Sequence, residues 1–440
     1  MPTTEIDTAE VTVEIDGHEV VAGTLRIFRR RSQRVGFQYA DSYLADPRAY
    51  PLDPALPLSA GFFQPPAGKD LFNFLSDAAP DRWGQTLMRR QELDRAKRSG
   101  TKAKDLTHAD FLLGVSDELR QGAIRLRPQG GTVYYTDSQE GVPRLVSVPR
   151  LIAASDAFLE GSDQDLRDLF AAGASLGGAR PKAAVRTQEG TLALAKFSRK
   201  SDEWDIIGFE RVQHVLAARS GIRVAQSQLL HTGSRGVLIV ERFDRAEGRR
   251  IGFMSALTAL EASYMDTRSY LEFAEVLARN SNEPGADLEQ LFRRIIFSIL
   301  TSNTDDHMRN HGLVRHGRGW DLSPAYDLNP NPEQTTHLAM AVTLDDTSAD
   351  VDLACSVADH FQLVQSRAKL IVGEIEEATR GWRQVAREHA IPRADLELME
   401  RAYVTDQRAA ATQLASLTLA MPPSLPSRGT SCPPLDNSTS

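Results

Sequence analysis

Residues 303–311, NTDDHMRNH, concentrate polar and acidic side chains in one short segment. The segment follows residues 288–300, whose apolar residues recur at steps of three and four and so predict a buried helix. Side chains that follow a core helix are held by a rigid scaffold and are suited to line a cleft. A second polar segment, residues 320–327 (WDLSPAYD), comes after a predicted short hairpin that turns at residues 317–319.

The order and spacing of three residues in these segments suit phosphoryl transfer. Such an enzyme needs an Asp that accepts the proton of the substrate hydroxyl and an Asn five positions later that reaches a metal ion. It also needs a second Asp, beyond a hairpin, that holds the Mg²⁺ bridging the phosphates. Asp305, Asn310 and Asp327 satisfy this order. Carboxylate and amide oxygens are the hard ligands that Mg²⁺ prefers.

Each of these residues also has an ordinary structural interpretation. Asn303, Thr304 and Asp305 are favourable residues for beginning a helix, and Asp327 suits a turn before Pro330. Taken singly, the residues favour that interpretation, whereas their joint order favours phosphoryl transfer.

Two other kinds of metal site use the same segment. His307 and His311 lie four positions apart, but Met308 stands where the zinc-protease motif requires Glu. Asp305, Asp306 and His307 suit a metal-dependent phosphohydrolase, which stays open as an alternative.

A kinase also needs a loop that covers the phosphates and a lysine on its small lobe. Residues 173–182, GASLGGARPK, are rich in glycine but match neither the Walker A motif nor the GxGxxG spacing, so alone they favour an ordinary loop. Lys196, late in a predicted strand, is placed to set a point charge on phosphate oxygens. A lysine on an edge strand that reaches toward solvent is the alternative. Glu210, in the following helix, is the natural ion-pair partner of Lys196.

The elements that must position these residues follow from their periodicity. The predicted strands are 183–186, 192–197, 224–231 and 236–241, and the predicted helix is 206–219. Beyond Phe243 the apolar spacing becomes helical, so the chain passes there from a small sheet to a helical region. The connection at residues 240–245, VERFDR, is placed to present backbone groups to an adenine edge, with Val240 or Phe243 beside the ring.

The N-terminal part is predicted to be rich in β-structure, because residues 11–15 and 20–27 alternate on either side of a tight turn. A helix is predicted at residues 80–98. Residues 82–104 contain eight Lys or Arg against two acidic residues, which indicates a solvated helix face or a docking surface for a partner. Residues 421–440 contain five Pro and five Ser and are predicted to be a disordered tail.

The composition excludes several classes of protein. The chain has 440 residues, of which 41% are hydrophobic, so it is not collagen-like or wholly disordered. With 51 Lys and Arg against 59 Asp and Glu, its net charge of −8 argues against a general DNA-coating protein or a polybasic membrane binder. Two cysteines, Cys355 and Cys432, exclude a disulfide framework. The N-terminus does not match a signal peptide and no apolar run approaches about 18 residues, which predicts a cytoplasmic protein without membrane contact.

Five motifs resemble the HipA family of toxin kinases from bacterial type II toxin–antitoxin modules. They are SLGGARPKAAV, LALAKFS, LIVERFDR, LTSNTDDHMRN and DLSPAYDLNP, in this order and at these separations. The resemblance extends over nearly all of residues 1–420, and DFLLGVSDELRQGAIRLRP also matches the N-terminal domain of the family. It implies an α+β, protein-kinase-like fold with a β-rich N-terminal region and nucleotide lobe and an all-helical C-terminal lobe. The implied domains are an N-terminal coupled domain (1–110), a β-rich kinase N-lobe with the phosphate loop (111–243), a helical C-lobe (244–421) and the tail (422–440).

The resemblance also implies ATP and Mg²⁺ as cofactors. Asp305 takes the catalytic role, and Asn310 and Asp327 become the Mg²⁺ ligands. The implied ATP-binding residues are the phosphate loop Gly177, Gly178, Ala179, Arg180, Pro181 and Lys182, then Lys196, the adenine hinge Glu241, Arg242 and Phe243, and finally His307, Asn310, Tyr326 and Asp327.

Ser175 falls at the position that this family autophosphorylates, which ejects the loop and inactivates the kinase. A dianionic group beside the ATP phosphates favours an open loop through repulsion. Arg180-Pro181 departs from the more flexible residues of some relatives, which predicts that loop ejection is harder in this chain.

The predicted function is an ATP- and Mg²⁺-dependent serine/threonine protein kinase that acts as the toxin of a toxin–antitoxin module. The implied target is a translation component such as an aminoacyl-tRNA synthetase. The implied partner is a small DNA-binding antitoxin of the HipB type, so that DNA is contacted only through it. Two alternatives stay open: a kinase-like interaction module that mainly bridges the antitoxin, suggested by residues 82–104, and the phosphohydrolase.

Overall fold

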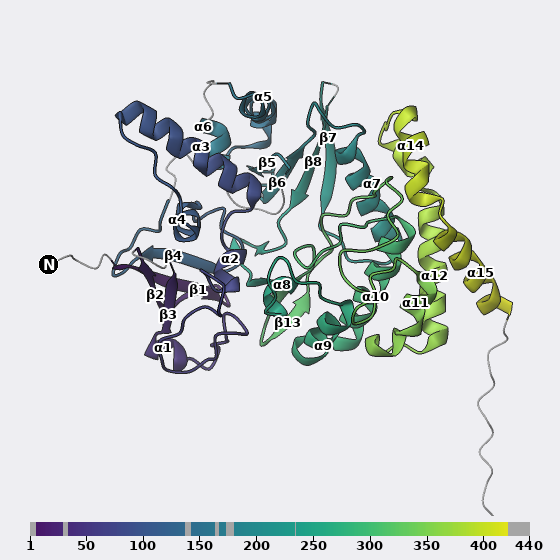
Figure 1. The fold of residues 1–440 in the computed structure, drawn as a ribbon, viewed down its shortest axis with the longest axis horizontal. Helices are drawn as coiled ribbons and strands as arrows, with labels where there is room; N and C mark the ends of the chain where they lie inside the picture. The colour runs from purple at the N-terminus through teal and green to yellow at the C-terminus, as the bar shows by residue number, and fades with distance from the viewer. Residues whose placement is uncertain are drawn as a thin grey trace, which may run out of the picture.

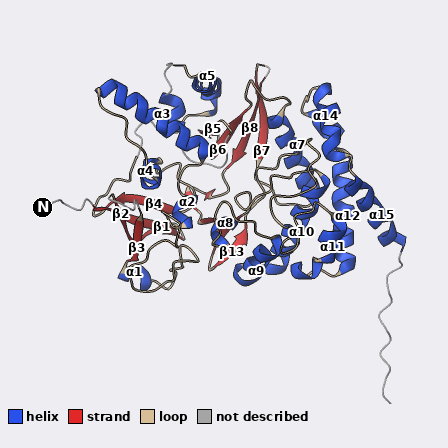
Figure 2. Ribbon diagram, in the orientation of Figure 1, coloured by secondary structure: helices blue, strands red, loops and turns tan. Residues whose placement is uncertain are grey.

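The computed structural model describes residues 6–29, 34–136, 142–162, 167–172, 180–233 and 235–420. Most strands lie before residue 256, and helices dominate the remainder of the chain (Figures 1 and 2). The molecule therefore has the predicted α+β composition, with a β-rich N-terminal part and a helical C-terminal part. Within the described ranges, no helix combines the length and the apolar character that crossing a membrane requires.

The first sheet has four antiparallel strands in the order β3-β2-β1-β4. Its strands are β1 (Ile6–Ile15), β2 (His18–Phe28), β3 (Val35–Tyr39) and β4 (Ile124–Pro128). Asp16 and Gly17 join β1 to β2 with φ values of 51° and 78°, the left-handed pair that a two-residue hairpin turn favours. Because β4 pairs with β1, the sheet extends past the predicted domain boundary at residues 110 and 111.

Four helices lie between β3 and β4 in the chain: α1 (Asp41–Leu44), α2 (Asn73–Asp77), α3 (Arg82–Ser99) and α4 (His108–Gly114). The predicted helix at 80–98 is α3, which begins after Asp81 and ends at Gly100, where φ is 62°. Figure 1 shows α3 at the outside of the molecule, beside α5 and α6. Part of its positive charge is paired, since Arg95 contacts Glu92 at 2.7 Å.

The second sheet is also antiparallel, with the order β5-β6-β8-β7. Its strands are β5 (Lys182–Arg186), β6 (Leu192–Phe197), β7 (Ser227–Thr232) and β8 (Arg235–Glu241). The apolar side chains of one face pack against α5 (Val148–Leu159), which follows the short 3₁₀ helix η1 (Leu145–Ser147) and precedes α6 (Arg167–Ala172). Those of the opposite face meet α7 (Ile206–Arg219), as the two-residue period of a strand requires.

The C-terminal part is built around one large apolar core. Its main helix is α10 (Pro284–Leu300), which contains the predicted buried stripe, and η2 (Ala358–Phe361) packs against it. The other helices are α8 (Ala256–Ala259), α9 (Tyr270–Asn280), α11 (Val351–Ser356), α12 (Gln365–Arg380), α13 (Trp382–Glu388), α14 (Arg393–Tyr403) and α15 (Asp406–Ala420). The strands are β9 (Arg245–Ala246), β10 (Arg249–Arg250), β11 (Phe253–Ser255), β12 (Gly312–His316) and β13 (Gly319–Leu322). The predicted tail from 421 onward lies outside the described residues.

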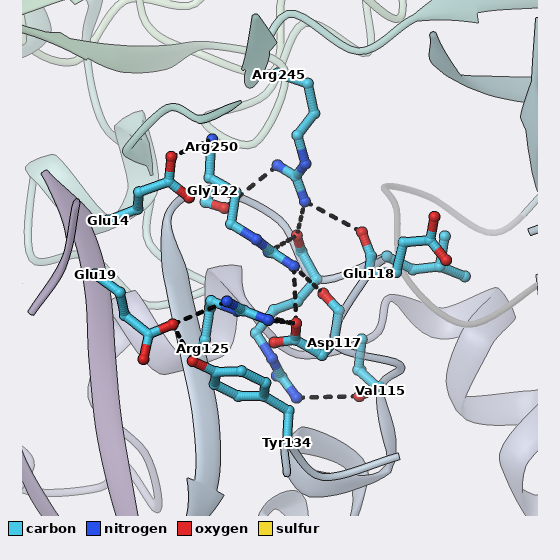
Figure 3. Close-up of polar contacts among 12 residues, drawn as sticks. Glu14, Glu19, Val115, Asp117, Glu118, Gly122, Arg125, Tyr134, Arg245 and Arg250 are labelled. Atoms are coloured by element: carbon cyan, nitrogen blue, oxygen red, sulfur yellow. Dashed lines mark hydrogen bonds and ion pairs between the residues drawn. The ribbon is translucent and has the colours of Figure 1, made fainter. Parts of the chain in front are cut away.

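Charged side chains join the N-terminal part to the segment after β8, as Figure 3 shows. Six residues form this interface cluster: Asp117, Arg120, Arg242, Asp244, Arg245 and Arg250. Arg245 donates to the carbonyl of Arg120 at 2.6 Å, and Arg250 donates to the carboxylate of Asp117 at 3.1 Å. The cluster therefore connects segments that are more than 120 residues apart in the sequence.

Candidate active site

The ammonium group of Lys196 lies between two carboxylates. It donates to Glu210 and, at 2.8 Å, to Oδ1 of Asp327. The side chains of Lys196 and Glu210 are 9% and 2% exposed, whereas that of Asp327 is 31% exposed. These three residues form the lysine cluster, which is open to solvent at the Asp327 end.

Three elements that are distant in sequence position the lysine cluster. Lys196 lies on β6, an inner strand of its sheet, so the alternative of an edge-strand lysine reaching into solvent is wrong. Glu210 lies on the buried face of α7, whose first turn is capped by the Asp205 side chain. Asp327 follows β13. The predicted pair of Lys196 and Glu210 forms, and the fold adds Asp327 to it.

Mutual attraction keeps Lys196 and Asp327 charged. Burial lowers the pKa of Lys196, but the attraction of Asp327 and Glu210 outweighs this and raises it above its usual value. Burial raises the pKa of Asp327, but Lys196 more than offsets this and brings it to about 2. The more enclosed Glu210 has a pKa raised by burial in spite of Lys196. At neutral pH, Asp327 therefore presents an ionised carboxylate at the open end of the cluster.

The loop after α10 carries the predicted catalytic residue. Asp305 is exposed, while Thr304 and Asp306 on either side are buried. Asn310 closes the loop, because its Nδ2 donates to the carbonyl of Asp305 at 2.9 Å. Partial burial raises the pKa of Asp305; the positive charge of His307 opposes this and the nearby carboxylates support it. An accessible carboxylate with a raised pKa is suited to accept a proton.

Asp306 anchors this loop to the core. Its carboxylate accepts the hydroxyl of Tyr270 at 2.7 Å and that of Ser298 at 3.2 Å, and it lies 3.1 Å from Nε2 of His311. Burial raises the pKa of Asp306, but His311 outweighs this and the pKa falls below its usual value. Asp306 thus fixes the loop against the core, while the side chain of Asp305 stays exposed.

The two histidines do not form a metal site together. Residues 301–311 form turns, so no new helix begins at Asn303 and no helical face carries both rings. His311 is 2% exposed and packs against Tyr270 and Phe273, with ring centroids 5.7 and 6.0 Å apart. His307 is only partly buried. The structure therefore places His311 in the core and away from solvent, whereas the ring of His307 is partly accessible.

Residues 320–327 connect the two lobes. Ala325 forms a parallel bridge with Val224, and the hydroxyl of Tyr326 donates to the carbonyl of Arg309 at 2.8 Å. Asp327 itself has a φ of 58°, a left-handed conformation that is uncommon for a residue with a side chain. Backbone conformations of this kind cluster at functional sites, where the surrounding fold holds them.

The oxygen atoms around Asp327 fit a hard cation. Asn310 uses its amide nitrogen in the bond to Asp305, which leaves its amide oxygen available as a ligand. Oδ1 of Asn329 is buried and has no hydrogen-bond donor among the described residues, and Nδ2 of the same side chain lies 3.5 Å from Asp327. A buried oxygen without a donor is costly unless water or a cation satisfies it. The residues present therefore fit Mg²⁺, and Asn329 joins Asn310 and Asp327 as a candidate ligand.

The side chains of the predicted adenine hinge point in different directions. The backbone N–H groups of Glu241 and Arg242 are used in the sheet, where they donate to Gln226 and Leu192. The Arg242 side chain is buried in the interface cluster, where it donates to Asp244 and to the Leu119 carbonyl, so the structure does not bring it to the lysine cluster. The Glu241 side chain is exposed.

Phe243 points the other way from Arg242. Its ring lies 5.5 Å from that of Tyr326, at an interplanar angle of 35°. The two rings pack against the buried side chains of Leu238 and Val240 from β8 in a small apolar cluster. The partly buried rings of Phe243 and Tyr326 are the accessible members of this cluster, and apolar side chains of this kind suit the face of a purine.

The structure describes only the last residues of the predicted phosphate loop, from Arg180 onward. Ser175, Gly177, Gly178 and Ala179 lie outside the described residues. Arg180 pairs with Asp202 at 3.0 Å, and the carbonyl of Pro181 accepts the backbone N–H of Phe197 at 3.0 Å. These two contacts hold the end of the loop beside β6, the strand that carries Lys196.

Lys182 forms an ion pair that the sequence does not predict. Its ammonium group lies 2.8 Å from Oδ2 of Asp81, and the two side chains are 3% and 7% exposed. Asp81 lies at the start of the predicted helix at 80–98 and caps α3, but nothing local indicates an ion pair with a residue 101 positions later. Asn329 was missed for a similar reason, because only the folded chain shows that its oxygen lacks a donor.

Two family models match the chain. The HipA N-terminal domain matches residues 13–126, and the HipA-like C-terminal domain matches residues 174–382. The second match contains Lys196, Asp305 and Asp327 together with the elements that position them.

Two curated relatives are named as kinases. Y4mE of Sinorhizobium fredii, provisionally named a kinase, is 25% identical over 354 residues, which are 72% of this chain and 78% of that protein. The serine/threonine-protein kinase toxin HipA of Shewanella oneidensis is 27% identical over 185 residues, which are 35% of this chain and 42% of that protein. These relatives confirm the prediction of a protein kinase.

A solved structure of a protein complex from Shewanella oneidensis has the same fold over nearly the whole of this chain. It comes from the toxin–antitoxin complex of HipA, HipB and operator DNA, with a TM-score of 0.61 and 18% identity over 94% of this chain and 96% of that chain. The predicted fold class is therefore confirmed. Since the two HipA domain models, the kinase relatives and the fold agree, this chain belongs to the HipA family.

Proposed function

We propose that this chain is an ATP- and Mg²⁺-dependent serine/threonine protein kinase and the toxin of a bacterial toxin–antitoxin module. The observation that carries the proposal is the contact of Lys196 with both Glu210 and Asp327. Beside it lies a loop in which Asp305 is exposed and Asn310 closes the turn. A lysine–glutamate pair, a metal-binding aspartate and a catalytic aspartate are the parts that kinases share.

The proposed roles follow from charge and exposure. ATP with Mg²⁺ supplies the phosphoryl group when bound. Lys196 orients phosphate oxygens through its positive charge, and Glu210 keeps Lys196 in place. Asp327 and Asn310 hold the metal ion through their oxygen atoms. Asp305 accepts the proton of the Ser or Thr hydroxyl of the protein substrate.

The reaction is tested with the full-length protein and labelled ATP. We expect label to pass from the γ-phosphate to a bacterial protein, and the Asp305→Asn variant to be slower by about 10²- to 10⁴-fold, the usual contribution of a general base. Asp346→Asn, an exposed aspartate that caps a turn at Ser348, is the matched control. Undiminished labelling by Asp305→Asn contradicts the proposal, and phosphate release without transfer to a protein favours the phosphohydrolase.

The proposed partners are a small DNA-binding antitoxin of the HipB type and a translation component such as an aminoacyl-tRNA synthetase. The fold shared with the HipA–HipB–operator complex supports the first, and family membership supports a cytoplasmic kinase. Co-purification with the antitoxin encoded beside the gene, followed by operator binding with and without it, tests the partner and its link to DNA. Reversing the charges of the exposed residues Arg98 and Lys102 tests whether residues 82–104 form the docking surface.

Autophosphorylation of Ser175 is proposed from family membership, since this residue lies outside the described ranges. Mass spectrometry of the wild-type protein is expected to find phosphate on Ser175, and the Asp305→Asn protein is expected to lack it. An unmodified Ser175 in a strongly active preparation contradicts this part of the proposal.

A further inference from the structure

Two residues at the start of α3 form hydrogen bonds with Lys182. The Asp81 carboxylate binds its ammonium group at 2.8 Å, and the Trp83 indole nitrogen donates to its carbonyl at 2.9 Å. Both contacts reach from the N-terminal part of the chain to the first residue of β5. The position of Lys182 is therefore set by an element that lies outside the kinase lobes.

Lys182 stands beside the lysine cluster. It is the direct partner of Lys196 in the pairing of β5 with β6. Burial lowers the pKa of Lys182, Asp81 and Asp327 attract its charge, and Lys196 repels it. A buried lysine next to a second lysine loses its positive charge readily unless a carboxylate accompanies it. The Asp81 carboxylate supplies that compensation at 2.8 Å; burial raises the pKa of Asp81, and the charge of Lys182 opposes this.

Asp81 is itself held rigidly. Its Oδ1 accepts the N–H of Gly84 at 2.7 Å and caps α3, which leaves Oδ2 for Lys182. Trp83, 3% exposed, packs edge-on against Phe158 with ring centroids 5.3 Å apart. A functional side chain is positioned accurately when its partner is fixed by packing and by a second hydrogen bond.

We propose that Asp81 is a positioning residue of the nucleotide site, which holds Lys182 in place for the phosphates of ATP and so makes the first turn of α3 part of that site. The inference rests on the proposed function, because it needs MgATP as the ligand. Lys182 touches the phosphates, and Asp81 acts only through Lys182.

The test measures nucleotide binding in the absence of turnover. Isothermal titration of the full-length protein with a non-hydrolysable MgATP analogue is carried out on wild type, Asp81→Asn, Lys182→Met and the double variant. We expect Asp81→Asn to weaken binding about tenfold, as the loss of a partner behind a ligand does at metal sites. In the Lys182→Met background the same substitution is expected to change nothing, because the two residues act as one unit. In turnover, KM for ATP is expected to rise while kcat at saturating ATP stays within about twofold.

Several outcomes overturn the inference. Unchanged or tighter binding by Asp81→Asn removes it, and so does an equal loss in both backgrounds. Asp53→Asn is the matched control, since Asp53 is 1% exposed and accepts the N–H groups of Phe74 and Ala55 in the same part of the chain. Should Asp81→Asn fail to fold, Asp81→Ser removes the same charge and keeps a capping oxygen.

The two proposals fail in different ways. Wild-type protein that binds no MgATP contradicts the proposed function. Wild-type protein that binds MgATP, together with an Asp81→Asn variant that binds it equally, contradicts only the role of Asp81.

Discussion

The lysine cluster and the interface cluster both bury charged side chains where distant segments meet, but they differ in their exposure to solvent. In the lysine cluster, Asp327 is 31% exposed and the neighbouring Asn329 oxygen has no donor among the described residues. In the interface cluster, Arg242 and Asp244 are 3% and 5% exposed, and Arg242 also donates to the Leu119 carbonyl at 2.7 Å. The first cluster is open to solvent at Asp327, whereas the second is closed to solvent, even though Oδ1 of Asp117 within it also has no donor among the described residues.

This difference predicts which substitutions reduce ligand binding and which reduce the folding free energy. A charge cluster that is closed to solvent is not accessible to a ligand, so breaking it costs mainly folding free energy. An open cluster can accept a metal ion or a phosphate, so breaking it costs mainly activity. Substitutions of similar chemistry in the two clusters are therefore expected to have opposite consequences.

The largest effect is expected for Asp327→Asn in the lysine cluster. The substitution keeps the shape of the side chain but removes the charge proposed to hold Mg²⁺, so phosphorylation is expected to fall by about 10³-fold or more. Lys196 keeps its bond to Glu210, and the midpoint of thermal unfolding is expected to stay within about 3 °C of wild type. A radiolabel assay and circular dichroism measure the two quantities. Activity near the wild-type level would remove Asp327 from the site.

The matching change in the interface cluster is Asp244→Asn. Burial raises the pKa of Asp244, but Arg242 and Arg245 outweigh this and lower it strongly, so the carboxylate is charged in the folded protein. Its loss leaves these buried arginines uncompensated, which is expected to cost about 3–5 kcal/mol of folding free energy in urea denaturation. Activity per folded molecule is expected to stay within about threefold. Glu247→Gln, an exposed partner of Arg249, is the control; a loss of activity without a loss of stability would contradict the comparison.

A smaller loss of stability is expected for Arg120→Met. The fully buried guanidinium donates to the carbonyls of Ala78, Leu112 and Val115, at the ends of α2 and α4. Burial lowers its pKa to about 10, so it is still charged at neutral pH. Without these donors the carbonyls stay buried and unpaired, which is expected to cost about 2–3 kcal/mol in the same urea experiment. Arg279→Met, on the surface of α9, should be close to neutral, and an equal change in both variants would show that Arg120 has no special role.

The smallest effect on folding free energy is expected at acid pH from the pair of Asp110 and Arg29. Its side chains are 10% and 23% exposed, which is intermediate between the two clusters. Burial raises the pKa of Asp110, but Thr107 and Arg29 outweigh this and bring it to about 2. Because this is below the unfolded value of about 3.9, its contribution of about 1–2 kcal/mol is present above pH 4 and is lost as the pH falls toward 2. Asp110→Asn is expected to flatten the acid side of the stability curve, measured by urea unfolding at pH 3 and pH 6. A parallel curve for the variant would contradict the assignment.

Local patterns in the sequence were sufficient for the elements of the site. The predicted strand at 192–197 and the predicted helix at 206–219 coincide with β6 and α7, because strand alternation and helical spacing are properties of short segments. The order of Asp305, Asn310 and Asp327 is likewise visible along the chain, and the fold places Asp327 beside Lys196. The roles of these residues stay predictions until they are tested.

Contacts between distant segments could not be predicted in the same way. The pairing of β4 with β1 joins residues on either side of the predicted boundary at 110 and 111. Arg242 lies within the predicted hinge, but its side chain turns into the interface cluster. Asp81 was recognisable only as a helix cap, since nothing local indicates that Lys182 will lie against it. Each of these depends on how two separately formed units pack.

Amino-acid types and their spacing by themselves determined the class of chemistry, because phosphoryl transfer needs particular oxygen and nitrogen ligands in a particular order. Tertiary structure decided which of these groups are open and which are closed. Asp305 and Asp306 are adjacent and chemically identical, yet one is exposed and the other is held by Tyr270 and His311 in the core. Burial and charge compensation are properties of the packed chain, so only the fold distinguishes a residue that can react from one that holds the structure together.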